Sequence, residues 1–301
     1  MSRSLATAIC AIVLLLLATG CAANRVTDLR RGPGDSLVFT ATTADGQPVD
    51  EQQLKAAEAV LHDRLDRLGY AYRLGHSGSD TMTVTLWKAN DLPRIATILS
   101  APGVLVFFDD AECRVSGPAQ SAAAAVDQAQ KKPLVDVPRT DRDRLVQLTE
   151  GPGLDGYLLV RAVPGVPSAD DTSDAFFVYK DQPVMTGEAV GSARKGLDSV
   201  GTPDVKIDFT TEGAAQFESV TRDLATRGAL KNVPQTFAIV LDGVMWSDPQ
   251  IDYQANPNGI AGGKAVITGR FSEQDATMLA VVLDSGALPV HLELKDPAPS
   301  N

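Results

Sequence analysis

The chain has 301 residues, of which 44% are hydrophobic, so it is long enough for two or three folded units rather than one small core. Its formal net charge is −11, which argues against nucleic acid or anionic lipid headgroups as partners, because both would repel an acidic chain. Outside the N-terminal segment Cys113 is the single cysteine, so the folded part can hold no internal disulfide.

The first twenty residues have the pattern of a signal peptide. Arg3 supplies a positive charge, and residues 11–17 form an apolar core that is too short for a permanent membrane span. The small residues before Cys21 resemble a lipobox, whose cysteine thiol receives a lipid that holds the protein on a membrane. We therefore expect residues 1–20 to be a lipoprotein signal peptide, Cys21 to be lipidated and residues 21–34 to be a polar tether. An ordinary secretory signal with an incidental cysteine is the alternative.

Residues 35–110 are expected to form the first half of an α+β base. Leu54, Leu61 and Leu65 lie on one face of a predicted helix, and Gly69 ends it. The predicted elements are strands at 36–42, 71–74, 82–87 and 104–108 and helices at 50–68 and 91–100. Their order, β-α-β-β-α-β, is typical of ferredoxin-like folds.

Residues 111–203 differ in composition and are expected to form an inserted α+β head subdomain. Thr186 is expected to cap a short helix that ends the head. The predicted elements are helices at 118–132 and 187–197 and strands at 157–163 and 176–179.

Residues 204–295 repeat the order of the first half with one extra strand and are expected to form the second ferredoxin-like half of the base, followed by a tail at 296–301. Asp242 and Gly243 form the residue pair that type I′ hairpin turns favour. Ser272 is expected to cap the last helix, and Gly286 to end it.

Several short motifs occur in a consistent order along the chain. They are DRLDRLG at 63–69, VMTG at 184–187, IDFTTEGAAQF at 207–217, AIVLDG at 238–243, ITGRFS at 267–272 and LDSGALP at 283–289. Together they resemble the first extracytoplasmic (P1) domain of SecD, an accessory subunit of the bacterial protein-export machinery. The resemblance covers residues 36–294 and is densest after residue 184.

The resemblance implies a base and a head subdomain, and a head that contacts polypeptide emerging from the export channel. SecD proteins continue into transmembrane helices that couple proton flow to this movement. The present sequence ends at Asn301 without such helices, and we expect a lipid at Cys21 to replace them. The resemblance therefore implies no proton-driven motor for this chain.

Residue types that carry enzymatic chemistry form no recognisable constellation. His62, His76 and His291 are far apart in sequence and lack metal-ligand spacing. The glycine-rich stretch at 258–265 fails as a phosphate-binding loop, because Asn258 and Ala265 replace required residues. We expect no catalytic residue, no cofactor, no metal site and no enzyme activity.

The sequence therefore favours a membrane-anchored extracytoplasmic binding module whose partners are secreted polypeptides or export machinery subunits. Candidate contacts are Phe176, Phe177 and Tyr179 on a predicted head strand, one face of which is expected to lie in the core. Tyr253, in the long connection at 248–264, is a further candidate, although it could instead pack over the sheet. A cell-envelope structural or assembly lipoprotein that keeps the fold without an export role is the alternative.

Overall fold

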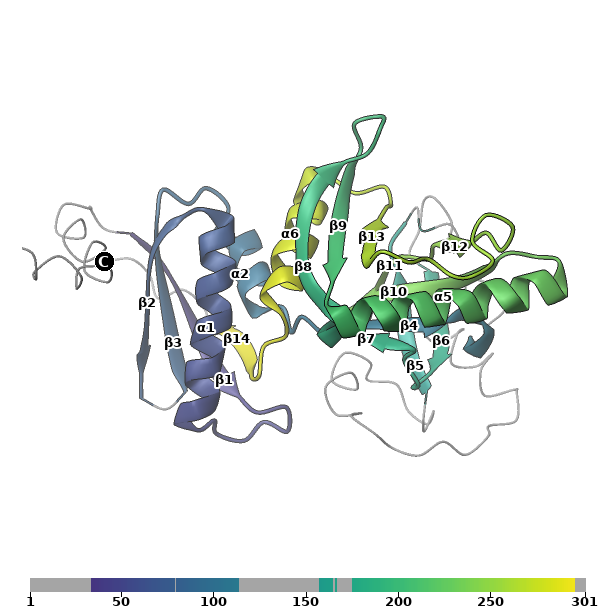
Figure 1. Cartoon of the computed structure of the whole chain (residues 1–301). Coiled ribbons are helices and arrows are strands. Elements are labelled where there is room, and N and C mark those ends of the chain that lie inside the picture. The colour runs from purple at the N-terminus through teal and green to yellow at the C-terminus, as the bar shows by residue number, and fades with distance from the viewer. Residues whose placement is uncertain (1–33, 79, 114–156, 165, 167–174, 296–301) are drawn as a thin grey trace, which may run out of the picture.

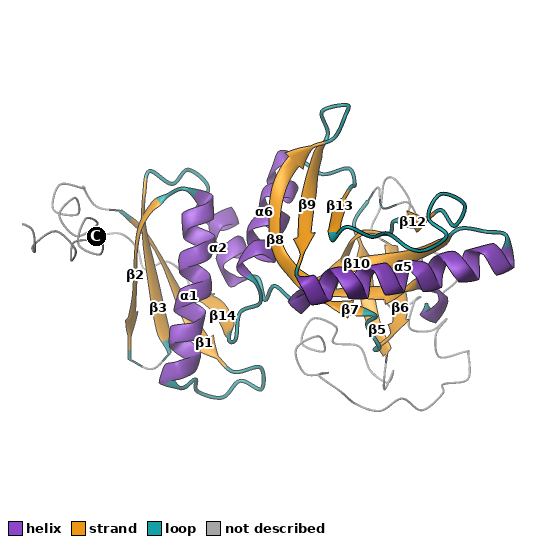
Figure 2. Cartoon of the chain, in the orientation of Figure 1, coloured by secondary structure: helices purple, strands orange, loops and turns teal. Residues whose placement is uncertain are grey.

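The computed structural model describes residues 34–78, 80–113, 157–164, 166 and 175–295 (Figure 1). The predicted signal peptide, Cys21, the tether, the predicted helix at 118–132 and the C-terminal tail lie outside the described residues. Helices and strands are mixed throughout the rest (Figure 2), which confirms the α+β class.

The first lobe is one antiparallel sheet with two helices on one face. The strand order is β14-β1-β3-β2. The elements are β1 (Asp35–Thr42), α1 (Glu51–Leu68), β2 (Ala71–Ser77), β3 (Thr81–Trp87), α2 (Leu92–Ser100) and β14 (His291–Lys295). Asp50 caps α1, and Gly69 ends the helix in the left-handed conformation. The end at Gly69 is the one that the sequence predicts.

The pairing of the first lobe corrects one expectation. The strand predicted at 104–108, observed as β4 (Leu105–Asp109), does not complete this sheet. It pairs with β10 (Gln235–Leu241) in another sheet, and the C-terminal β14 takes the place beside β1. All four residues Leu105–Phe108 are buried, so β4 needs cover on both faces, which an outer strand of the first sheet would not receive.

The second lobe contains two further sheets. One has the order β6-β5-β11-β10-β4-β7, with β12 also paired to β10, and the other has the order β13-β9-β8. Their remaining strands are β5 (Tyr157–Ala162), β6 (Ala175–Lys180), β7 (Met185–Thr186), β8 (Val190–Leu197), β9 (Pro203–Phe209), β11 (Val244–Ser247), β12 (Gln250–Ile251) and β13 (Lys264–Ile267). The helices are α5 (Thr211–Lys231) and α6 (Glu273–Ser285), with the 3-10 turns η2 (Asp110–Glu112) and η3 (Gly187–Ala189).

The strands of residues 204–295 are therefore shared among all three sheets. The expected second ferredoxin-like half does not form a sheet of its own, because β9, β10 and β14 each find partners in a different sheet. The residue boundaries expected for base and head stay a prediction.

The segment predicted as a helix after Thr186 is a second correction. It forms the single turn η3 and then β8, which pairs with β9 along its length. Two glycines, Gly191 and Gly196, weaken a helix here, and a Cβ at Gly191 would lie 3.2 Å from the backbone oxygen of Asp208. Pairing with a neighbouring strand outweighs the local helical pattern.

Three buried apolar clusters hold the lobes. One lies between the first sheet and α1 and α2, and one joins α5 and α6 to the strands of the second lobe. The third lies on the other face of the sheet that contains β4, β5, β6, β10 and β11. In the part of the chain that the structure describes, no helix combines the length and hydropathy that a membrane span needs.

Candidate functional site

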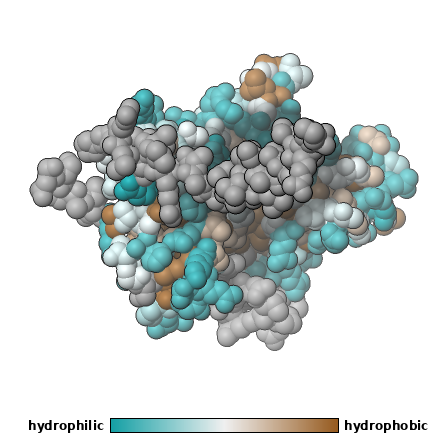
Figure 3. All heavy atoms as spheres, turned by 60° about the vertical axis from the view of Figure 1, so that its left-hand side comes forward, coloured by the Kyte–Doolittle hydropathy of each residue, from teal (hydrophilic) through white to brown (hydrophobic). Residues whose placement is uncertain are grey.

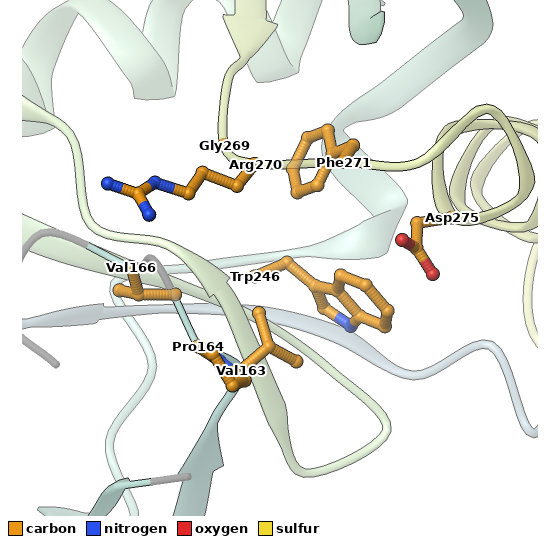
Figure 4. A pocket seen from close by; sticks show the side chains of 8 residues that line it. All are labelled: Val163, Pro164, Val166, Trp246, Gly269, Arg270, Phe271 and Asp275. Atoms are coloured by element: carbon orange, nitrogen blue, oxygen red, sulfur yellow. The ribbon is translucent and has the colours of Figure 1, made fainter. Parts of the chain in front are cut away.

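A pocket of about 300 Å³ lies in the second lobe, where β5, β11 and the connection from β13 to α6 approach one another. Trp246 and Val163 form one side and Phe271 and Arg270 the other, with Asp275 of α6 at one end (Figure 4). Pro164, Val166 and Gly269 complete the lining. This volume is at the lower end of ligand pockets in proteins.

Packing fixes the aromatic wall of the pocket. The rings of Trp246 and Phe271 meet edge to face, with 6.2 Å between centroids. A Cβ at Gly269 would lie 2.6 Å from the Phe271 ring, so glycine is needed for the ring to hold this position. The Ser247 hydroxyl donates to the carbonyl of Thr268 at 2.9 Å, which ties β11 to the opposite wall.

The polar end of the pocket is set by the start of α6. The Asp275 carboxylate accepts from the backbone N–H of Ser272 at 2.9 Å and from its hydroxyl at 2.6 Å, while the Ser272 hydroxyl accepts from the Asp275 backbone. The sequence predicts Ser272 as the cap, and the structure adds a reciprocal capping box with Asp275 that holds the carboxylate in place. Asp275 therefore closes the pocket as a fixed polar group.

The lining of the pocket is mostly apolar. Among the eight described residues that line the pocket, none is a serine, cysteine, histidine or lysine. Valine, proline, tryptophan and phenylalanine side chains offer an apolar surface, and a guanidinium and a carboxylate stand beside it. Such a pocket fits a large apolar side chain whose backbone stays near the polar edge.

The sequence motifs contain both key aromatic residues but do not mark them as neighbours. Phe271 belongs to the motif at 267–272, and Trp246 follows the predicted hairpin turn. Two signals were present in the sequence: an aromatic residue shortly after the predicted turn, and a Gly-x-Phe step directly before the predicted helix.

The candidate contacts on β6 divide between the two faces of the strand. Phe177 and Tyr179 are buried, with 4% and 2% exposure, in the cluster between β4, β5 and β10. They therefore cannot contact a partner from this conformation, which corrects the expectation for these two residues. Phe176 is half-buried and stays a prediction.

The hydroxyl of Tyr179 has a polar partner, Asp110, in this largely buried region. The hydroxyl donates to Asp110 at 2.6 Å, and burial raises the pKa of Tyr179 above its ordinary value. Burial also raises the pKa of Asp110, while hydrogen bonds from Thr236 and Tyr179 oppose that shift. The backbone of Cys113 forms a bridge to Tyr179. These contacts fasten η2 to β6.

Tyr253 packs over α5. A Cβ at Gly228 would lie 3.1 Å from the Tyr253 ring, so the ring rests on the bare helix backbone. Its hydroxyl donates to the side-chain oxygen of Asn232 at 2.8 Å. Further along the connection, the Ile260 N–H donates to the Thr221 hydroxyl at 2.8 Å. The long loop is thus attached to α5, and a partner contact by Tyr253 stays a prediction.

Two of the three histidines have local partners. His62 Nδ1 lies 2.7 Å from the Tyr72 hydroxyl, and His76 Nδ1 lies 2.7 Å from Glu58, while His291 is exposed on β14. Within the described ranges, no group of three or more His, Cys, Asp or Glu residues is placed to hold a metal ion.

The β8–β9 hairpin presents a different kind of surface. It projects from the second lobe in Figure 1, and Leu197 and Val200 near its turn are 53% and 83% exposed. The projection at the top of Figure 3 carries hydrophobic atoms. These side chains form a convex tip, whereas the Trp246–Phe271 pocket is the concave feature, and we take the pocket as the candidate site.

Comparison with known proteins places the pocket in a recognised region. Residues 164–290 match the family model of the SecDF P1 head subdomain. This region includes residues on both sides of the boundary expected at residue 203, and all pocket residues except Val163.

Curated relatives are longer proteins. The translocase subunit SecDF of Thermus thermophilus is 40% identical over 114 residues, which are 38% of this chain and 14% of that protein. The translocase subunit SecD of Rhodobacter capsulatus is 28% identical over 258 residues, which are 86% of this chain and 37% of that protein. The chain thus spans well under two thirds of the length of these relatives.

Solved structures agree with the sequence matches. A structure described as that of a membrane component SecDF that enhances protein export is 28% identical, with a TM-score of 0.53 over 87% of this chain and 98% of that one. A SecDF crystal structure in a super-membrane-facing form gives a TM-score of 0.56 over 87% of this chain and 30% of that one. These findings confirm the resemblance to the P1 domain of SecD and SecDF.

Proposed function

We propose that this protein is an extracytoplasmic, non-enzymatic binding module that assists protein export by contacting secreted polypeptide or a subunit of the export machinery. The proposal rests on the similarity to a solved SecDF structure described as that of a membrane component that enhances protein export. The match covers 87% of this chain and 98% of the solved chain. The proposal includes a lipid at Cys21 as the membrane tether, which rests on the sequence pattern alone.

The Trp246–Phe271 pocket is the contact site in this proposal. A secreted chain that is still unfolded exposes large apolar side chains, and a rigid aromatic pocket binds such a side chain without ordering many of its own groups. Arg270 and Asp275 at the edge offer a donor and an acceptor to the polar backbone of the same segment.

Site-specific photocrosslinking in cells tests this proposal. A photoreactive amino acid would replace the exposed Arg270 at the pocket or, as the control, the exposed Glu51 at the start of α1 in the other lobe. We expect secreted chains or export subunits to be captured from position 270 and not from position 51, and the additional change Trp246→Ala to reduce the yield. Capture of neither class from position 270 would refute the export proposal.

The same experiment distinguishes the export proposal from the alternative, in which the protein has a structural or assembly role in the cell envelope. After secretion is stopped, crosslinks to secreted chains should disappear, whereas a stable envelope partner would stay captured at an unchanged yield. The proposed lipid tether is tested separately with the variant Cys21→Ala, which should release the protein from the membrane fraction. Full retention of this variant in the membrane fraction would refute lipidation as the sole anchor.

A further inference from the structure

Two polar atoms of the Trp246–Phe271 pocket have no hydrogen-bond partner among the described residues. They are the indole Nε1–H of Trp246, which is a donor, and Oδ1 of Asp275, which is an acceptor. Both side chains are half-buried, and neither atom is fully closed off from solvent. A ligand that fills the pocket would therefore cover one donor and one acceptor that the described part of the protein leaves unused.

The Asp275 carboxylate is held so that one of its oxygens faces a ligand. Oδ2 accepts both bonds from Ser272, one from the backbone N–H at 2.9 Å and one from the hydroxyl at 2.6 Å. Oδ1 takes part in neither bond, and no ion pair between described residues involves Asp275. Because the capping box already fixes the side chain, a ligand that binds Oδ1 has little side-chain motion to restrict.

Trp246 is held in place by its neighbours in a similar way. Its ring meets that of Phe271 edge to face, and its strand β11 pairs with β5. In Figure 4 the indole and the Asp275 carboxylate lie toward one end of the pocket, whereas the Arg270 side chain extends toward the other. A ligand group at the first end can therefore meet the donor and the acceptor together.

This arrangement favours a side chain with an apolar body and a tip that both donates and accepts. A phenylalanine or leucine side chain fills the apolar part but leaves both polar atoms covered and unpaired, which lowers affinity. A lysine side chain donates but cannot accept, and the guanidinium of Arg270 repels it. Serine, threonine, asparagine and glutamine donate and accept but offer little apolar surface. Tyrosine has an aromatic ring and a hydroxyl that does both.

We propose that the pocket selects a tyrosine side chain of the bound segment. The ring lies against Trp246 and Phe271, and the hydroxyl donates to Asp275 Oδ1 and accepts from Trp246 Nε1–H. The volume of about 300 Å³ is small enough that one side chain, and not a folded element, enters it. This inference rests on the proposed function, because it takes the pocket as the contact site for polypeptide, and it narrows the large apolar side chain to one with a hydroxyl at its tip.

NMR titration of the full chain with short peptides tests the selectivity. The peptides share one uncharged host sequence and differ at a single central residue, which is tyrosine, phenylalanine, leucine or lysine. We expect the tyrosine peptide to move the indole N–H signal of Trp246 and to bind about tenfold tighter than the phenylalanine peptide, because two polar atoms gain a partner. The indole signal of Trp87, the second tryptophan of the chain, belongs to the first lobe and should not move.

Two variants distinguish a direct contact from a change at the start of α6. Asp275→Ala removes Oδ1 together with the capping box, and it should bring the affinities of the tyrosine and phenylalanine peptides to within about twofold of each other. Ser272→Ala is the matched control: it removes the hydroxyl from the same capping box but keeps Oδ1, so the preference for tyrosine should stay.

Three results would overturn the proposal: equal affinities of the tyrosine and phenylalanine peptides, tightest binding of the lysine peptide, or an equal loss of preference in both variants. The first two need only the unchanged protein, so they decide even if Asp275→Ala does not fold. Equal affinities combined with capture of secreted chains from position 270 would remove the selectivity and leave the export proposal standing. If no peptide binds and position 270 captures nothing, both proposals fail.

Discussion

Arg227 of α5 donates to both carboxylate oxygens of Asp109, at 2.6 and 2.7 Å, and so joins the second lobe's long helix to the end of β4. Both side chains are largely buried, with 28% and 18% exposure. The Arg227 Nε also donates to Gln235 at 3.0 Å on the neighbouring β10. One guanidinium therefore connects α5 and the following strand β10 to β4, whose Asp109 lies 118 residues earlier in the chain.

Replacing Arg227 with Met should lower the free energy of unfolding by about 1–3 kcal/mol, because Asp109 and Gln235 lose their partner in a partly dry setting. Urea unfolding measures the change. Lys55→Ala is the matched control: its ion pair with Glu51 is mostly exposed and should contribute less than about 1 kcal/mol. Equal effects of the two changes would contradict the bridging role of Arg227.

Replacing Gly213 with Ala should also destabilise the fold. A Cβ there would lie 2.2 Å from the backbone oxygen of Ala189, so α5 would have to move away from η3. We expect a loss of about 1–3 kcal/mol, measured by urea unfolding. At Gly75 an added Cβ meets no heavy atom within 4 Å, and Gly75→Ala should be neutral or stabilising. A neutral Gly213→Ala would show that the contact is loose.

The two faces of β6 should respond differently to truncation. Phe177→Ala removes a buried ring from the core and should cost about 3–5 kcal/mol. Phe176→Ala, one residue away at a half-buried position, should cost about 1 kcal/mol or less. Thermal or urea unfolding measures both. A small cost at Phe177 would mean that β6 does not keep this packing in solution.

The pKa of Asp110 predicts a dependence of stability on pH. Burial raises its folded pKa above the unfolded value, so between these two values the folded state binds more protons than the unfolded state. Its contribution to the free energy of unfolding therefore falls as pH rises from about 4 toward neutral. Once the pH is above the folded pKa, this contribution is constant.

Asp110→Asn removes that titration while keeping an oxygen that can accept from Tyr179. The urea midpoint of the wild type should therefore drop relative to that of the variant as pH increases over this range. All other groups are shared, so they cancel in the comparison. Parallel curves for the two proteins would exclude Asp110 as the titrating group.

Local structure followed from the sequence wherever neighbours in the chain provide the stabilising contacts. The end of α1 at Gly69 and the cap of α6 at Ser272 both appear as the sequence predicts. The turn at Asp242 and Gly243 also appears, with φ of 52° and 76°. Each of these features is decided within a few residues, so no distant partner could change it.

The candidate site could be predicted only in part. The motif that contains Phe271 marked the region, yet the approach of Trp246 and Val163 depends on the parallel pairing of β5 with β11. The aromatic residues on β6 looked like a contact surface, but the neighbouring strands of the sheet bury Phe177 and Tyr179. Exposure depends on which elements cover a strand, and alternation along the strand does not reveal them.

Composition and local patterns by themselves thus determined the α+β class, the positions of most helices and hairpins, and the family resemblance. Tertiary structure alone decided that β4 joins β10, that β14 completes the first sheet and that residues after Thr186 form a strand. It also placed Arg64 between two helix ends 34 and 222 residues away in the chain. The physical reason is the same in each case: strand partners and buried charges are selected by distant backbone groups, whose positions exist only once the lobes have packed.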